Sequence, residues 1–131
     1  MIGLDTNVLV RYLTQDDPVQ SAQATAIIEC QVTEEQPGFI SLIAIVETVW
    51  VLDRVYRFPN AEISQAIERI LQADTLRVQN EQEVFTAMIA LKDGVASFSD
   101  ALIGALDAWA GCRTTLTFDR KAARLEHFRL V

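Results

Sequence analysis

Short apolar runs alternate with segments of helical periodicity along this chain, and this alternation limits the possible folds more than any other feature. The predicted strands are residues 1–4, 39–41, 76–78, 114–118 and, as a possible edge strand, 128–131. Predicted helices lie between them, and the clearest are residues 6–13, 18–33, 42–56, 97–110 and 120–125. The pattern predicts a three-layer α/β fold with a short central parallel β-sheet and helices on both of its faces. No repeat or linker interrupts it, so we expect one domain over residues 1–131.

The composition excludes several other classes of protein. Half of the residues are hydrophobic and 22% are charged, which rules out a disordered chain. Two cysteines are too few for a disulfide framework, so we predict a reducing cytoplasmic location. The first residues lack the basic and apolar regions of a signal peptide. The longest apolar stretch, residues 38–52, is too short to span a bilayer and contains Glu47, so we expect no membrane segment.

The net charge of −7 is unevenly distributed. Residues 113–131 contain five basic and two acidic side chains, whereas residues 1–112 contain six basic and sixteen acidic ones. This balance argues against general nucleic-acid binding, which depends on basic side chains that contact phosphates. The basic C-terminal segment is consistent with a metal site that handles phosphate, or with a solvated helix face. The mean hydropathy of +0.19 is high for a domain of this size and indicates an oligomer or partner surface.

Three aspartates occupy positions where catalytic acids and helix caps both occur. Asp5 and Asp119 each follow a predicted strand, at the carboxyl edge where open α/β sheets bind ligands. Asp100 lies in the first turn of a predicted helix, where the helix dipole favours a carboxylate. Capping alone can explain each of the three.

Glu47 is harder to explain by local structure. It is the only ionisable residue between Phe39 and Leu52, in a helix that is apolar all round and is therefore predicted to be buried. A buried carboxylate is costly unless a cation meets it, and the basic candidates Arg54 and Arg57 lie two or more helical turns away. A salt bridge to a residue distant in sequence stays open as an alternative.

Together the four acids predict a site for a hard divalent cation. Carboxylates brought close together repel one another, and a cation reverses that effect. Oxygen ligands without histidine or thiolate favour Mg²⁺ or Mn²⁺, which polarise a phosphoryl oxygen and lower the pKa of an attacking water. The chemistry indicated is phosphodiester hydrolysis. The single histidine, His127, excludes a two-histidine transphosphorylation, and no Ser-His-Asp set or glycine-rich nucleotide loop is present.

Four segments of the chain resemble the motifs of the PIN domain and, within that family, of the VapC-type toxins of bacterial toxin–antitoxin pairs. They are IGLDTN at residues 2–7, IVE at 45–47, SDALIGA at 99–105 and LTFDR at 116–120. Each segment is weak alone, but the four occur in the right order and spacing. The resemblance covers nearly the whole chain.

The resemblance implies a Mg²⁺- or Mn²⁺-dependent endoribonuclease that leaves a 5′-phosphate and a 3′-hydroxyl. Asp5 and Asp100 would then be the central metal ligands. Glu47 would ligate the metal or orient water, and Asp119 would support a second metal or act through water. Thr6 or Asn7, together with Thr117, would hydrogen-bond these carboxylates.

The same resemblance implies partners. Proteins of this type form homodimers and are inhibited by a small VapB-type antitoxin, which fills a hydrophobic groove and blocks the acidic site. Trp50, Tyr56 and Phe58 fit such a groove, although core packing explains Trp50 equally well. Three basic residues near the C-terminus are candidates for contact with RNA phosphates: Arg120, Lys121 and Arg124.

Two other functions compete with this interpretation. An aspartyl-phosphate phosphatase would need a second acid two residues after the first, but the segment Asp5-Thr6-Asn7 lacks it. A non-catalytic PIN-like module that binds RNA or a protein partner is the other alternative. Four clustered negative charges argue against that module, because binding alone gains nothing from them.

Overall fold

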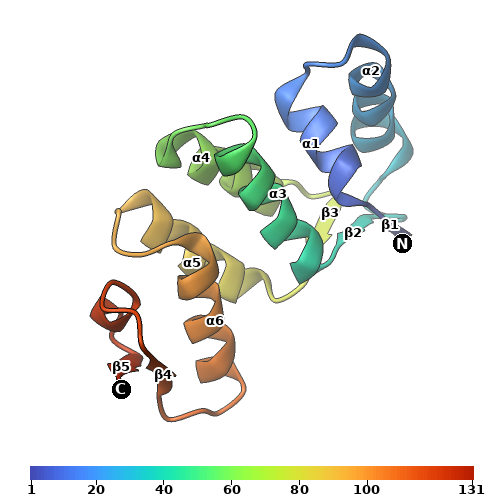
Figure 1. Ribbon diagram of the computed structural model, residues 1–131. Coiled ribbons are helices and arrows are strands. Elements are labelled where there is room, and N and C mark those ends of the chain that lie inside the picture. Colours follow the sequence, from blue (N-terminus) through green and yellow to red (C-terminus); the bar gives the residue numbers. More distant parts are fainter.

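The computed structural model describes residues 1–131 and contains a parallel sheet of three strands surrounded by helices (Figure 1). The strands β1 (Ile2–Gly3), β2 (Gly38–Ile40) and β3 (Leu76–Val78) lie in the order β1-β2-β3. Gly3 pairs with Phe39, which pairs with Arg77. These parallel strands and the helices that connect them confirm the predicted α/β class with a three-layer arrangement.

Six α-helices connect and cover the strands. They are α1 (Thr6–Thr14), α2 (Pro18–Ala26), α3 (Leu42–Arg54), α4 (Asn60–Gln72), α5 (Glu81–Lys92) and α6 (Phe98–Trp109). Asp17 caps α2 by accepting hydrogen bonds from two backbone amides, and Ser97 caps α6, as the sequence predicts. Asparagine favours a capping position, but Asn60 is the first residue of α4, and Pro59 occupies the capping position.

Some predicted boundaries differ from the structure. The predicted helix over residues 18–33 is α2 followed by a π-helical segment, Ile27–Gln31. The predicted helix over residues 120–125 is only a short 3-10 turn, Ala122–Arg124. No helix combines the length and the apolar character that crossing a membrane requires.

The core lies where the helices meet the three-stranded sheet. It contains 22 buried residues, among which Ile40, Ile45, Leu52 and Ile67 are fully enclosed. Helix α6 packs along α5 through buried residues such as Phe98 and Leu102, so these two helices form one unit. A fully buried aliphatic side chain contributes about 1.5–3 kcal/mol, and this cluster therefore supplies most of the stabilisation.

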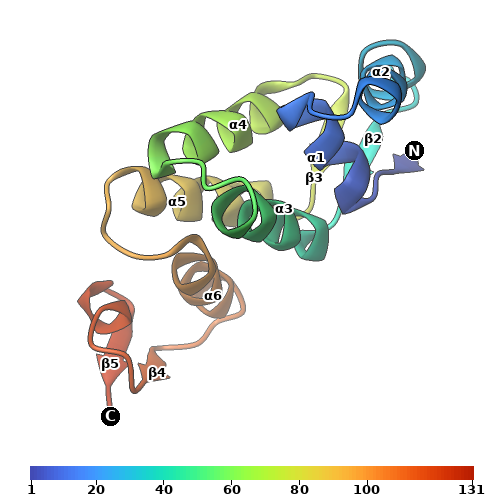
Figure 2. The ribbon, with the colours of Figure 1, turned by 45° about the horizontal axis from the view of Figure 1, so that its top comes forward.

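The last two strands form a separate sheet. The strands β4 (Thr115–Thr117) and β5 (Phe128–Leu130) pair in parallel with each other and with no other strand. Figures 1 and 2 show this pair beyond α6, at the opposite end of the molecule from β1. We call residues 113–131 the C-terminal sheet segment. Its division from the first sheet was not predicted from the sequence.

Candidate active site

The first acid of the predicted site stands at the junction of β1 and α1. Asp5 is the N-cap of α1, and its carboxylate accepts a hydrogen bond of 2.9 Å from the backbone amide of Thr6. The Asp5 side chain is exposed, whereas Thr6 is buried. The capping bond uses the Asp5 atom Oδ1 and leaves Oδ2 free of hydrogen bonds.

Glu47 lies beside this junction but is not buried. The prediction of a helix buried all round is wrong for one stripe of α3, on which Ile43, Glu47 and Trp50 are all exposed. The Glu47 atom Oε1 accepts a hydrogen bond of 3.2 Å from the Thr6 hydroxyl. Thr6 therefore holds two carboxylates, one through its backbone amide and one through its side chain.

The third acid, Asp100, is not among the residues that line a pocket together with Glu47. It is in the first turn of α6, is half-buried, and its backbone amide donates to the Ser97 hydroxyl at 3.1 Å. The neighbouring Ser99 lines an apolar groove between α3 and α6 that Glu47 also lines. No hydrogen bond connects the carboxylate of Asp100 to the other acids.

Asp119 belongs to the C-terminal sheet segment. Its Oδ1 atom accepts a hydrogen bond of 2.8 Å from the backbone amide of Lys121 and a longer one from Ala122, so Asp119 caps the short 3-10 turn after β4. The Asp119 side chain is exposed. Because β4 lies in the second sheet, the chain by itself does not place Asp119 beside Asp5.

None of the four acids is neutralised by a basic side chain. The ion pairs of the chain are Arg11–Asp16 and Arg54–Asp53, and neither involves the predicted site. At the same time, no group of three or more acidic, histidine or cysteine side chains is close enough to hold a metal ion. The single chain therefore brings together Asp5 and Glu47 but does not assemble the full set of four.

The residues predicted to support the carboxylates differ in what they contact. Thr6 bonds to Glu47, as described above. Asn7 is exposed and lines a groove on the side of α2, with no hydrogen bond to an acid. The Thr117 hydroxyl accepts a bond of 3.0 Å from the backbone amide of Asp119, so it contacts that residue's main chain and not its carboxylate.

The three basic candidates for RNA contact are exposed and form no ion pairs. Arg120 and Arg124 belong to the C-terminal sheet segment. Lys121 reaches toward α3, because it lines a pocket together with Trp50, Asp53 and the start of α6.

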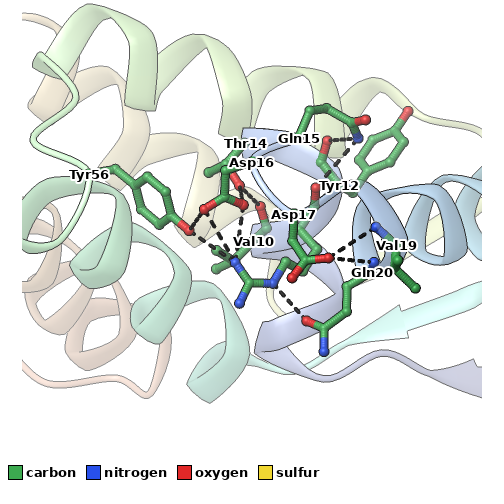
Figure 3. Close-up of polar contacts among 10 residues, drawn as sticks. Val10, Tyr12, Thr14, Gln15, Asp16, Asp17, Val19, Gln20 and Tyr56 are labelled. Atoms are coloured by element: carbon green, nitrogen blue, oxygen red, sulfur yellow. Dashed lines mark hydrogen bonds and ion pairs between the residues drawn. The ribbon is translucent and has the colours of Figure 1, made fainter.

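A polar network that the sequence did not reveal fixes the end of α1 (Figure 3). Asp16 accepts hydrogen bonds from the Tyr56 hydroxyl at 2.6 Å, from Thr14 at 2.9 Å and from Arg11 at 3.1 Å. The bond from Tyr56 is the main cause that lowers the pKa of Asp16 to about 2. Tyr56 is 40 residues away in sequence, so no local pattern could have indicated this contact.

This network also changes the interpretation of the aromatic residues. Tyr56 is half-buried and packs edge-to-face against Phe58, which is also half-buried. Of the three aromatic residues predicted to line the groove, only Trp50 is mostly exposed, at 58%. Tyr56 and Phe58 therefore belong to the packing around the end of α3, and only Trp50 adds to an exposed apolar surface.

The fold and the placement of the acids define an α/β protein with carboxylates at the ends of parallel strands and at a helix start. The PIN domain family model matches residues 2–127, and the chain belongs to this family. PIN domains are generally nucleases, generally use divalent metals, and are often toxins of toxin–antitoxin pairs. No curated protein matches the chain.

Proposed function

We propose that this protein is a Mg²⁺- or Mn²⁺-dependent endoribonuclease, and that it is the VapC-type toxin of a toxin–antitoxin pair. The observation that carries the proposal is the pair of carboxylates held by Thr6. Asp5 and Glu47 come from segments 42 residues apart, yet both bond to the same threonine and neither meets a cation of the protein. Such a pair is unfavourable unless a cation from solution joins it.

The carboxylates at this junction fit a Mg²⁺ ion, which usually takes few of its ligands from the protein. That ion commonly binds through one or two carboxylates and completes its coordination with water and substrate phosphate. Asp5 and Glu47 would hold it, with Asp100 and Asp119 as further acids. The bound ion would polarise a phosphoryl oxygen and lower the pKa of an attacking water.

The chain's own residues then have separate tasks. Thr6 orients Glu47 by donating its hydroxyl hydrogen, which leaves the Glu47 atom Oε2 free to accept a proton or a ligand. The exposed position of both carboxylates leaves room for a phosphate. Lys121 and its basic neighbours Arg120 and Arg124 would contact the RNA phosphates and offset the repulsion from the acids.

The toxin assignment adds partners and a location. The groove between α3 and α6 is lined mainly by apolar side chains and also by Glu47, so an apolar segment of a VapB-type antitoxin seated there would cover the acid. The exposed Cys30 and Cys112 are free thiols, which supports a reducing cytoplasm. A homodimer is the oligomer that we propose.

The experiment compares RNA cleavage by the wild-type chain and by Asp5→Asn and Glu47→Gln. Asparagine keeps the capping bond of Asp5, and glutamine keeps an acceptor for Thr6, so both variants should fold. Each should lower the cleavage rate at least about 100-fold, as the loss of one group that stabilises developing charge typically does. EDTA should abolish cleavage, and added Mn²⁺ should restore it.

A matched control removes a charge elsewhere. Asp74 is exposed and its side chain makes no hydrogen bond or ion pair, so Asp74→Asn should cleave RNA at the wild-type rate. Cleavage that persists in EDTA, or that is equal in Asp5→Asn and Asp74→Asn, would show that the acids are not the site.

The runner-up is a PIN-like module that binds RNA or a protein without cutting. It is favoured by one observation, which is that the single chain gathers no set of three metal-binding side chains. RNA binding that is unchanged by Asp5→Asn, with no cleavage by any form of the protein, would establish the runner-up.

A further inference from the structure

A second pocket lies beside the apolar groove, between α3 and the start of α6. It has a volume of about 340 Å³ and is lined by residues of α3 and α4, of the segment that leads into α6, and of the C-terminal sheet segment. Helices α3 and α6 are neighbours in both views of the molecule (Figures 1 and 2). Ser99 lines both this pocket and the groove that contains Glu47. We call it the Trp50 pocket, and its volume falls in the range of about 300–1,000 Å³ that is typical of small-ligand sites.

The pocket presents an aromatic side chain that the chain itself leaves mostly uncovered. Trp50 is exposed and pairs with no other aromatic ring, although its helix neighbours Val49 and Leu52 are buried. It lines the Trp50 pocket and not the apolar groove. Proteins that recognise single-stranded RNA stack unpaired bases on side chains of this kind. Trp50 is therefore available to a flat aromatic ligand.

The charged side chains of the pocket favour an anionic ligand. They are Asp53, Arg54 and Lys121, and all three are exposed. Two basic residues against one acidic residue make the pocket net positive, in a chain whose net charge is −7. The apolar groove differs, because its only charged lining residue is Glu47. A local positive charge beside an aromatic side chain suits a nucleotide better than an apolar peptide segment.

Two of the predicted acids lie close to the Trp50 pocket. Glu47 and Trp50 are three residues apart on the exposed stripe of α3, a spacing that places their Cβ atoms about 5–6 Å apart. From the C-terminal sheet segment, the backbone amide of Lys121 donates to Asp119 at 2.8 Å. A nucleotide whose base stacks on Trp50 would therefore have a phosphate near Glu47 and near the Lys121 ammonium.

The carboxylate of Asp53 distinguishes between the four bases. An ionised carboxylate only accepts hydrogen bonds, and its two oxygens match two adjacent N–H donors. Guanine offers such a pair, N1–H and the N2 amine. Adenine and cytosine have an amine beside a ring nitrogen that accepts, and uracil has a single N–H between two carbonyls. The contact of 3.5 Å between Asp53 Oδ2 and Arg54 Nε is exposed and weak, so a base can share the carboxylate.

We propose that the Trp50 pocket binds an unpaired guanine of single-stranded RNA, with Trp50 stacked on the base, Asp53 accepting from N1–H and the N2 amine, and Lys121 on a neighbouring phosphate. The position of the cut, next to the bound guanine, rests on the proposed nuclease function. The binding of the base does not, because it needs neither a metal ion nor any of the four predicted acids.

The test measures the fluorescence of Trp50 as RNA is added in EDTA. The chain has two tryptophans, so Trp109→Phe leaves Trp50 as the only one. The probes are uridine hexanucleotides with guanine, inosine, adenine or cytosine at the third position, and inosine differs from guanine only by lacking the N2 amine. The guanine probe should quench Trp50 and bind at least about 10-fold more tightly than the other three. The absence of quenching, or equal affinity for all four probes, would overturn the proposal.

Two pairs of variants control this measurement. Trp50→Phe leaves Trp109, which is exposed but lies outside the pocket and should report no change. Asp53→Asn keeps only one acceptor oxygen and should lose the preference for guanine over inosine, whereas Asp74→Asn should keep it. Equal quenching of the two tryptophans, or an unchanged preference in Asp53→Asn, would contradict the assignment.

Acrylamide quenching without RNA tests whether a protein surface covers the pocket instead. Trp50 should be quenched equally at all protein concentrations, and protection that grows with concentration would show that a second copy fills the pocket, which would overturn the proposal. Because binding is measured without metal or cleavage, the two proposals can fail separately. Guanine-specific quenching of a chain that never cuts RNA would refute the nuclease alone, and cleavage without any quenching of Trp50 would refute the guanine pocket alone.

Discussion

Asp16 shows how strongly a few hydrogen bonds can fix one side chain. Three donors from two distant parts of the chain converge on its carboxylate: the Tyr56 hydroxyl, the Thr14 hydroxyl and the Arg11 guanidinium (Figure 3). The first of these does most to lower the pKa of Asp16 from 3.8 to about 2. The network thereby joins the end of α1 to the segment that follows α3.

This lowered pKa predicts a loss of stability in acid. Above pH 4 the Asp16 carboxylate is ionised in both the folded and the unfolded chain, and its full stabilisation is present. As the pH falls from about 4 to about 2, the unfolded chain binds a proton before the folded chain does, so the free energy of unfolding decreases. Asp16→Asn should be less stable than wild type at pH 6 but should lose less on acidification. Urea unfolding between pH 6 and pH 2 measures both, with Asp74→Asn as the control. Parallel curves for Asp16→Asn and wild type would contradict the prediction.

At the scale of helices and strands, the features that the sequence predicted well are those that depend on neighbouring residues. Asp17 before Pro18 and Ser97 before Phe98 gave the starts of α2 and α6, because capping involves only neighbouring residues. The pairing of strands is not local, so the sequence showed that residues 115–117 form a strand but not which edge they join.

The candidate site was predictable to a similar extent. The positions of Asp5 and Glu47 at one junction follow from the fold, but the exposure of Glu47 does not. An apolar helix face indicates that another surface packs against it. That surface can belong to the same chain or to a partner, and the apolar pattern is the same in both cases.

At the scale of the helices and strands, Gly104 in α6 is the position where adding one methyl group should change the stability most. A Cβ at this residue would overlap the Phe128 ring of β5. Alanine normally stabilises a helix interior by about 1 kcal/mol over glycine, but overpacking costs about 1–3 kcal/mol, so Gly104→Ala should be destabilising on balance. Combining it with Phe128→Leu should remove the overlap and make the alanine favourable. Urea unfolding of the two single variants and the double variant gives this coupling. An equal effect of Gly104→Ala in both backgrounds would show that the contact is unimportant.

At the scale of the whole molecule, the separation of the two sheets explains why one chain does not gather its acids. Asp5 and Glu47 both bond to Thr6, just after β1, while Asp119 follows β4. Figure 2 shows β4 beyond α6, far from β1. The two carboxylates held by Thr6 are therefore the part of the set that is available to a bound ion, whose remaining coordination water and substrate phosphate would complete.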